Sequence, residues 1–437
     1  MVQSKKIGVI SLGCDKNRVD TEKMLAILKK QHQIVSDVED AQIIIVNTCA
    51  FLESSRKEAI EEILSAAEYK GVSAEKLIVT GCLPQKFVEE LFYDLPEVDA
   101  FLGVSDYGEL LEVIERIYKG ERVNAVGAPR EECGKRRVLT TDYHAYLKIA
   151  DGCSNHCTYC LIPFIRGGYR SVPIDDLIEE VRGLGQVKEL ILVAQDTAKY
   201  GYDLDGKPTL TKLIRELSKE KNVESIRLLY CYPENITDEL IEELKTNDKL
   251  IKYIDIPFQH ADDKVLKLMN RKGTGAGYLE LVERLKSEVK GIAIRSTFIT
   301  GFPRESEEAF NNLVEFLKSA KLFNAGFFRY SKEDGTAAAR LDGQIAQSVK
   351  TKRWKKLYSV QKAVVKENLK EFKGKTLKVL AEGFDSDELV YYGRAYFNAP
   401  DVDGKVFFFS ADEVVYGEYV DVKIIKATGY DLYGERI

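Results

Sequence analysis

Cys153, Cys157 and Cys160 form a C-x₃-C-x₂-C array in one short stretch of the chain. Thiolates are soft ligands that select iron–sulfur clusters or zinc. A 4Fe–4S cluster is usually held by four thiolates, one on each iron, so three local thiolates leave one iron open to another ligand. A zinc site would need a fourth ligand, and His156 inside the loop is badly placed to supply it. The spacing therefore favours an iron–sulfur cluster, with zinc as the alternative.

A second set of cysteines is Cys14, Cys49 and Cys82. Each follows a short apolar run typical of a strand, and amphipathic runs at helical spacing lie between them. The strand-like runs are residues 7–12, 42–46 and 77–80. Such alternation predicts a parallel sheet with helices on its faces, a Rossmann-like α/β domain. Because the carboxyl ends of parallel strands share one edge, we expect a second three-thiolate site there. A lone cysteine in such a place would more often be a small buried residue.

Strand and helix runs alternate again from about residue 143 to 330, after a charged stretch at 121–140 that we interpret as a linker. About six βα units predict a full or partial (β/α) barrel of the TIM type, with its chemistry at the carboxyl ends of the strands. The first cysteine array follows the first of these strands. Cys133 in the linker and Cys231 at a later strand end lie outside both cysteine sets, and we expect no ligand role for them.

The last 66 residues change to a two-residue periodicity with Gly, Asp and Asn turns, which predicts a small all-β, OB-like barrel. The expected strands are residues 376–382, 389–397, 405–409 and 419–427. This segment, 372–437, has eight Lys or Arg against twelve Asp or Glu, a net charge of −4. An acidic barrel is a poor phosphate binder, so a basic protein is the more natural partner.

Composition and charge place the chain among globular proteins. Its 437 residues predict two to four domains, and its net charge of −6 argues against a large non-specific nucleic-acid surface. The apolar runs are too short to span a bilayer, and the start of the sequence lacks the pattern of a secretory signal. We therefore expect a cytoplasmic protein without a membrane partner, in which nucleic-acid contact is secondary and the cysteines stay reduced.

The array at Cys153 also carries an aromatic residue, Tyr159, and in these features it resembles the radical SAM (S-adenosylmethionine) motif. With a three-cysteine domain before it and a β-barrel after it, the whole chain resembles the radical SAM methylthiotransferases. The resemblance implies an N-terminal methylthiotransferase domain at 1–136, a radical SAM domain at 137–371 and a TRAM domain at 372–437.

Two branches of that family differ in substrate. Residues 11–22, 47–52, 194–197, 253–260 and 393–404 are similar to the branch that modifies an aspartate of small-subunit ribosomal protein number twelve. The alternative branch modifies an adenosine of tRNA. A non-enzymatic iron–sulfur electron carrier or a zinc-stapled scaffold is the remaining hypothesis. The chain departs from the usual family pattern at Val172, Arg304 and Ser306, none of which is a cluster ligand.

The resemblance implies two 4Fe–4S clusters and two molecules of SAM. The cluster at Cys153, Cys157 and Cys160 would bind SAM at its open iron, and one electron would cleave it to a 5′-deoxyadenosyl radical that takes a hydrogen from the aspartate β-carbon. The open iron of the cluster at the other three cysteines would carry or activate the sulfur to be inserted, and a second SAM would donate the methyl group. An electron donor such as flavodoxin or ferredoxin is required. No catalytic side chain beyond the cluster ligands is expected.

Five further residues are expected to contact SAM. They are Tyr159, Gln195, Asp196, Thr197 and Arg295. Tyr159 would lie against the adenine, the three consecutive residues would end a barrel strand, and Arg295 would meet the SAM carboxylate because arginine suits carboxylates. The alternatives are plain loop packing for Tyr159, a polar strand end for 195–197, and an internal ion pair for Arg295.

Overall fold

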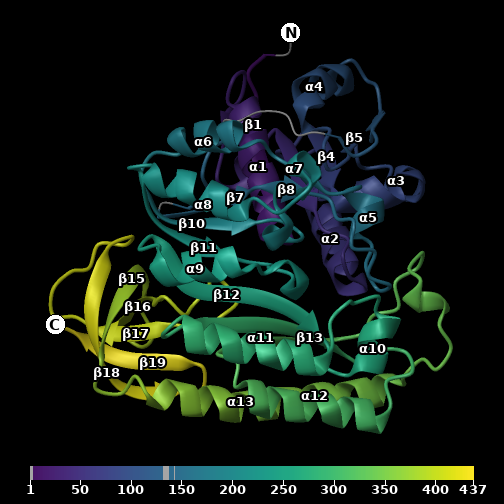
Figure 1. Cartoon of the computed structure of the whole chain (residues 1–437). Helices are drawn as coiled ribbons and strands as arrows, with labels where there is room; N and C mark the ends of the chain where they lie inside the picture. Colours follow the sequence, from purple (N-terminus) through teal and green to yellow (C-terminus); the bar gives the residue numbers. More distant parts are fainter. Residues whose placement is uncertain (1–2, 131–136, 142) are drawn as a thin grey trace.

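The computed structural model of the chain describes residues 3–130, 137–141 and 143–437. Its described part contains two six-stranded sheets, a closed five-stranded barrel and a two-stranded ribbon. Figure 1 shows the first sheet and its helices above the second sheet, with the small barrel beside the base of the second. The predicted multidomain α/β fold, with a Rossmann-like sheet, a partial barrel and a small β-barrel, is confirmed.

The first sheet is parallel throughout and has the strand order β2-β1-β3-β4-β5-β6. Every residue of its central strand β3 is buried, because helices cover both faces of a parallel sheet. The strands are β1 (Lys6–Ser11), β2 (Gln33–Ile34), β3 (Ile43–Thr48), β4 (Lys76–Gly81), β5 (Ala100–Leu102) and β6 (Val123–Ala125). The principal helices are α1 (Asp15–Leu28), α2 (Glu53–Ala67), α3 (Cys82–Asp94) and α4 (Leu110–Tyr118).

The interpretation of residues 121–140 as a linker is wrong for the first residues of that stretch. Strand β6 lies within that stretch and pairs with β5, which makes it the edge of the first sheet. It is a three-residue strand without a periodic pattern, so only its tertiary pairing defines it. Cys133 lies outside the described residues.

The second sheet is a curled half-barrel of parallel strands in sequential order from β14 to β7. Its strands are β7 (His144–Lys148), β10 (Val187–Val193), β11 (Val223–Leu228), β12 (Leu250–Gln259), β13 (Ala293–Thr300) and β14 (Asn324–Arg329). The short ribbon beside β7 is β8 (Ala150–Asp151) with β9 (Arg170–Ser171). The helices of this domain are α5 (Ile162–Ile165), α6 (Ile174–Arg182), α7 (Tyr202–Asp205), α8 (Leu210–Lys219), α9 (Asp238–Thr246), α10 (Asp263–Leu268), α11 (Gly275–Glu288) and α12 (Glu307–Ala320).

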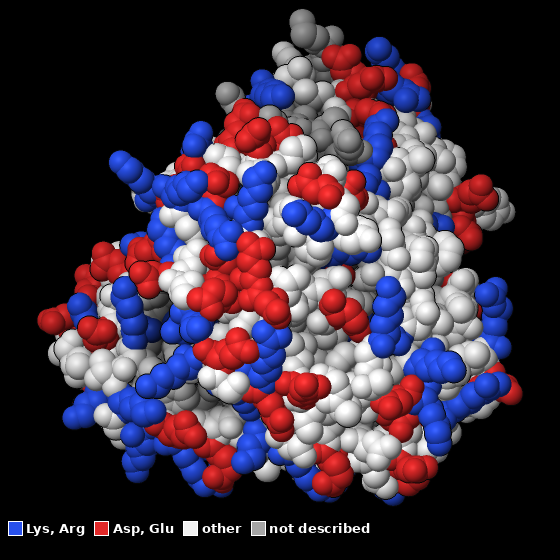
Figure 2. Space-filling model, in the orientation of Figure 1, with Lys and Arg blue, Asp and Glu red and all other residues white. Residues whose placement is uncertain are grey.

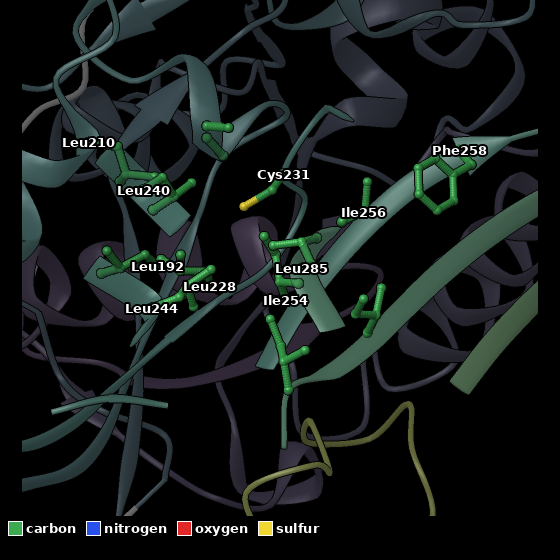
Figure 3. Close-up of a cluster of buried hydrophobic side chains, with 14 of the residues drawn as sticks. Leu192, Leu210, Leu228, Cys231, Leu240, Leu244, Ile254, Ile256, Phe258 and Leu285 are labelled. Atoms are coloured by element: carbon green, nitrogen blue, oxygen red, sulfur yellow. The ribbon is translucent and has the colours of Figure 1, made fainter. Parts of the chain in front are cut away.

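The core of this domain lies between the strands and the helices outside them. Ile254, Ile256 and Phe258 of β12 are fully buried there, at alternate positions of the strand. Figure 3 shows Cys231 inside the same cluster, among leucine and isoleucine side chains. Cys231 is fully buried, and burial raises its thiol pKa. The structure thus gives it a packing role, as expected from the sequence.

The long helix α13 (Gln347–Lys370) leads into the closed barrel, whose strand order is β15-β16-β17-β19-β18. The strands are β15 (Thr376–Asp385), β16 (Val390–Arg394), β17 (Val406–Phe409), β18 (Tyr419–Thr428) and β19 (Asp431–Arg436). The sequence analysis missed β19, because its charged residues and Gly434 obscure the two-residue pattern. This barrel shares an apolar cluster with inward-facing residues of the half-barrel, including Ile191 and Val193.

Buried charges fix the barrel against the half-barrel. Arg394 of β16 donates to Glu189 Oε2 at 2.8 Å, and Arg227 of β11 pairs with the same carboxylate. Arg227 also donates to the Tyr396 carbonyl at 2.8 Å. Because these groups are buried, their mutual pairing is needed to offset desolvation. The third domain is therefore held at a defined position on the half-barrel.

Acidic and basic side chains are interspersed over the face shown in Figure 2, without a large region of one sign. That face also carries an area without charged side chains, on the side where α3 lies in Figure 1. In the part of the chain that the structure describes, no helix is both long enough and apolar enough to cross a membrane.

Candidate functional site

Cys14, Cys49 and Cys82 converge at one edge of the first sheet. Cys14 follows β1, Cys49 follows β3 and Cys82 opens α3 directly after β4. Those three strands are consecutive neighbours in the sheet, so their carboxyl ends lie side by side. The thiols of Cys14 and Cys49 both raise the pKa of Cys82 by their charge, which requires all three to be close. The sequence-predicted grouping is therefore present, and the ligand role of these cysteines stays a prediction.

Glycines let the chain turn immediately before two of these cysteines. Gly13 and Gly81 have φ angles of +92° and +98°, a conformation that side chains with a Cβ rarely adopt. A Cβ on Gly13 would lie 2.6 Å from Cys49 Cβ. A Cβ on Gly81 would lie 2.4 Å from Asn47 Oδ1. Each turn thus brings a cysteine close to the neighbouring strand end.

The buried side chain of Asn17 ties the three cysteine segments together. Its Nδ2 donates to the carbonyl of Leu12 at 3.1 Å and to the carbonyl of Thr48 at 2.9 Å. These carbonyls lie just before Cys14 and Cys49. The Cys82 thiol donates to Asn17 Oδ1 at 3.8 Å. One amide at the start of α1 therefore contacts all three segments.

The second set, Cys153, Cys157 and Cys160, lies in the loop that follows β8 at the open end of the half-barrel. The Cys153 amide donates to the Gly167 carbonyl at 3.0 Å, which closes the loop on itself. The Cys157 thiol lies 2.8 Å from the Tyr232 hydroxyl, and the Ile162 amide donates to Cys160 Sγ at 3.4 Å. These contacts orient two of the three sulfur atoms from neighbouring segments.

Burial sets the protonation of these thiols. It raises the pKa of Cys82 to about 12 and that of Cys153 to about 11, and it raises the pKa of Cys160 as well. Such thiols stay protonated and inert at neutral pH unless a cation offsets the charge of the thiolate. A bound metal centre does so, because a coordinating thiol is deprotonated outright.

Each donor set consists of three thiols. Among residues 3–130, 137–141 and 143–437, no three histidine, cysteine or acidic side chains are placed to hold one metal ion. A 4Fe–4S cluster is held by one thiolate on each iron, so three thiols would leave one iron open. Soft thiolates without added histidine or carboxylate also match that centre.

Gln195, Asp196 and Thr197 follow β10 and are joined to the cysteine loop. Gln195 Nε2 donates to Asp151 Oδ1 at 3.1 Å, and Asn155 Nδ2 donates to Asp196 Oδ2 at 3.1 Å. Burial raises the pKa of Asp196 to about 6, although the hydrogen bonds that its carboxylate accepts act to lower the pKa. Thr197 Oγ1 instead accepts the amide of Ala194 at 3.1 Å. The structure thus brings Gln195 and Asp196 to the Cys153 loop, and their contact with SAM stays a prediction.

Tyr159 and Arg295 lie in different surroundings. Tyr159 packs against the small apolar cluster that contains Met269 and Phe302. Arg295 lies deeper, on the inner face of β13, and donates to Asp255 Oδ1 at 2.9 Å. Its Nε also lies 3.4 Å from Asp403 of the third domain. Two carboxylates thus compensate the charge of Arg295, which is the internal ion pair given above as the alternative to a SAM contact. Its contact with SAM stays a prediction.

Arg271 is a buried cation beside the Cys153 loop that the sequence analysis missed. Its guanidinium lies 3.8 Å from the centre of the Tyr232 ring, and its Nη2 donates to the Pro257 carbonyl at 2.6 Å. Its charge acts on Tyr159, and both its charge and a side-chain hydrogen bond act on Tyr278. No local pattern distinguishes this arginine from others in the sequence, so only the fold reveals it.

Family comparisons assign the three regions of the chain. Residues 6–103 match the family described as Uncharacterized protein family UPF0004, 147–317 match the Radical SAM superfamily, and 374–437 match the TRAM domain. The boundaries predicted at 136/137 and 371/372 stay predictions.

Curated relatives match over nearly the full length. The "Ribosomal protein uS12 methylthiotransferase RimO" of Acetivibrio thermocellus is 47% identical over 446 residues, covering 99% of this chain and 98% of the relative. The protein of the same name from Caldanaerobacter subterraneus subsp. tengcongensis is also 47% identical, covering 99% of this chain and all of the relative.

Solved structures share the fold at low sequence identity. The radical S-adenosylmethionine methyltransferase TsrM from Kitasatospora setae, solved with cobalamin and a [4Fe-4S] cluster, has a TM-score of 0.54 at 13% identity, covering 75% of each chain. The cobalamin-dependent S-adenosylmethionine radical enzyme OxsB has a TM-score of 0.54 at 12% identity, covering 82% of this chain and 56% of OxsB.

The half-barrel with its three-cysteine loop defines a radical SAM enzyme. Near full-length identity of 47% to curated relatives shows more: the chain belongs to the RimO family of methylthiotransferases and is a transferase. The resemblance inferred from the sequence is therefore confirmed at the level of the family, and the non-enzymatic hypothesis is wrong.

Proposed function

We propose that the chain adds a methylthio group to the β-carbon of an aspartate in ribosomal protein uS12, using two 4Fe–4S clusters and SAM. The names of its relatives support the substrate and the reaction. The observation that carries the two-cluster proposal is the presence of two separate sets of three thiols that are joined through one polar network. The cytoplasmic location and the flavodoxin- or ferredoxin-type electron donor remain predictions.

The six cysteines divide the work. Cys153, Cys157 and Cys160 would hold one cluster, and their three thiolates leave an iron open for the amino and carboxylate groups of SAM. The other three cysteines would hold the second cluster. When bound, one cluster would supply the electron that cleaves SAM to a radical, and the other would carry or activate the sulfur to be inserted. The protein itself has to position these groups and keep the radical away from solvent.

The start of helix α1 packs against the end of β11, near the site. The ammonium of Lys16 lies 3.8 Å from the centre of the Tyr230 ring, and the Tyr230 hydroxyl donates to Asp15 Oδ2 at 3.0 Å. These contacts hold the segment after Cys14 against the end of β11. A packed cover of this kind limits water at the reacting carbon, where a radical would otherwise be lost to side reactions.

Arg271 is the arginine that we propose for the SAM carboxylate. It is buried beside Cys157 and Tyr159 and forms no ion pair with a carboxylate among the described residues, whereas Arg295 is compensated by two carboxylates. A charged hydrogen bond contributes about 1.5–3 kcal/mol, so Arg271→Gln should weaken SAM binding by about 10- to 150-fold. Isothermal titration of the reconstituted protein with SAM measures this. A larger loss in Arg295→Gln than in Arg271→Gln would instead support the original prediction.

The substrate is tested by offering both classes to the same enzyme. Reconstituted protein is incubated with reductant, SAM and a sulfide source, together with either uS12 or unmodified tRNA. We expect a methylthio mass on an aspartate peptide of uS12 and none on tRNA nucleosides, consistent with the net charge of −4 of residues 372–437. Modification of tRNA alone would establish the alternative substrate and refute the proposal.

A further inference from the structure

Arg166 is a fully buried arginine that joins the two cysteine sites. It follows α5, close after the Cys153 loop, and belongs to the half-barrel domain. Its Nη1 donates to Asp151 Oδ2 at 2.9 Å, next to that loop. Its Nη2 donates to Asn17 Oδ1 at 2.7 Å and to Asp20 Oδ2 at 2.9 Å, both on α1 of the first domain. One guanidinium thus contacts both domains.

Among the described residues, Arg166 shares two buried carboxylates with a second cation, Lys148. Lys148 pairs with Asp20 and lies 3.7 Å from Asp151 Oδ2, while Arg166 pairs with the same two carboxylates. All four side chains are buried. The two cations therefore share the same two carboxylates.

The two cations of this group differ in their relation to the first cysteine site. Arg166 contacts Asn17, whose amide connects the segments of Cys14, Cys49 and Cys82. Asn17 Oδ1 accepts from Arg166 Nη2 at 2.7 Å and from the Cys82 thiol at 3.8 Å, so one oxygen atom joins the guanidinium to that thiol. Lys148 makes its ion pairs with the two carboxylates, on the side of β7.

We propose that Arg166 is a positioning residue for the first cysteine site, and that its charge stabilises the reduced form of the cluster held there. The inference rests on the proposed two-cluster function. A buried positive charge near a cluster favours the more negative, reduced state, because electrostatic interactions are strong where solvent is excluded. Since Arg166 belongs to the radical SAM domain, docking of that domain raises the midpoint potential of the cluster in the first domain.

The test measures the midpoint potential of the first cluster alone. Full-length protein with Cys153, Cys157 and Cys160 changed to alanine is reconstituted with iron and sulfide, and its remaining cluster is titrated with reductant and followed by EPR. Two double variants are compared in this background: Asp20→Asn with Arg166→Gln, and Asp20→Asn with Lys148→Gln. Each removes one cation and one anion, so the net charge of these four residues is the same in both variants.

We expect the Arg166 double variant to have a more negative midpoint potential than the Lys148 double variant. Both variants lack the Asp20 carboxylate, so the difference between their midpoint potentials reports the different effects of Arg166 and Lys148 on the cluster. Arg166→Lys keeps the charge but not the forked geometry, and its potential should stay close to that of the parent.

Equal potentials in the two double variants would overturn this inference and leave the proposed function standing. An Arg166→Lys potential as negative as that of the Arg166 double variant would overturn the assignment of the effect to charge. A parent protein that reconstitutes without any 4Fe–4S cluster would overturn the two-cluster proposal, and the inference with it.

Discussion

Replacing Asn17 with alanine should remove the first cysteine site without removing the second. The substitution leaves the Leu12 and Thr48 carbonyls without this donor, while Nη2 of Arg166 keeps its hydrogen bond to Asp20. At about 1 kcal/mol for each carbonyl, the free energy of unfolding should fall by about 2 kcal/mol. The segments before Cys14 and Cys49 would lose their common anchor.

Iron analysis and urea unfolding measure both effects. The reconstituted parent should hold about eight iron atoms per chain, and Asn17→Ala about four, because the loop at Cys153 keeps its own contacts. SAM cleavage to 5′-deoxyadenosine should persist in the variant. Asn124→Ala is the matched control in the same domain, since Asn124 is exposed and accepts only the Val126 amide at 3.1 Å among the bonds described. Its effect on unfolding should stay within about 0.5 kcal/mol.

Full iron content in Asn17→Ala would refute the reasoning. Loss of all iron would also contradict it, because the two sites would then depend on one another for assembly. A loss of stability equal to that of Asn124→Ala would show that the buried amide contributes nothing to the site.

Cys157→Ala should abolish SAM cleavage. Cys49→Ala should keep SAM cleavage but stop methylthiolation. Full methylthiolation by Cys49→Ala would show that the second cluster takes no part in the mechanism. Gly81→Ala should lower stability by at least about 2 kcal/mol in urea unfolding, because φ is +98° and the new Cβ would lie 2.4 Å from Asn47 Oδ1. Burial raises the pKa of Asp196 from 3.8 to about 6. The folded apoprotein thus binds this proton more tightly than the unfolded chain, and its stability should fall by about 2–3 kcal/mol as pH rises from about 4 to about 6. Asp196→Asn should lack that contribution, and identical pH profiles would contradict it.

Topology explains why the cysteine grouping could be predicted from the sequence. Cys14, Cys49 and Cys82 each follow an apolar strand, and parallel strands end at one edge of a sheet. The strand pattern and the parallel arrangement of the strands were therefore enough to predict that the three cysteines lie together. The same reasoning predicted the half-barrel, because its strands occur in sequential order and each is followed by a helix.

The polar network could not be predicted in this way. Arg166 and Asn17 are 149 positions apart in the chain and meet only when two domains dock. Arg271 was missed for the same reason, since its neighbours are Tyr232 and the Cys153 loop rather than residues close in sequence. Strands β6 and β19 were missed because pairing, and not periodicity, defines them. Sequence patterns predicted the elements, while contacts between domains had to come from the structure.

Mass spectrometry of uS12 from a strain that lacks this protein tests the central claim most directly. Ribosomes are isolated from the deletion strain and from the same strain expressing either the intact chain or Cys49→Ala. The account predicts that the methylthio mass on the uS12 aspartate is absent in the deletion strain, is restored by the intact chain and is not restored by Cys49→Ala. An aspartate that still carries the methylthio group in the deletion strain would contradict it.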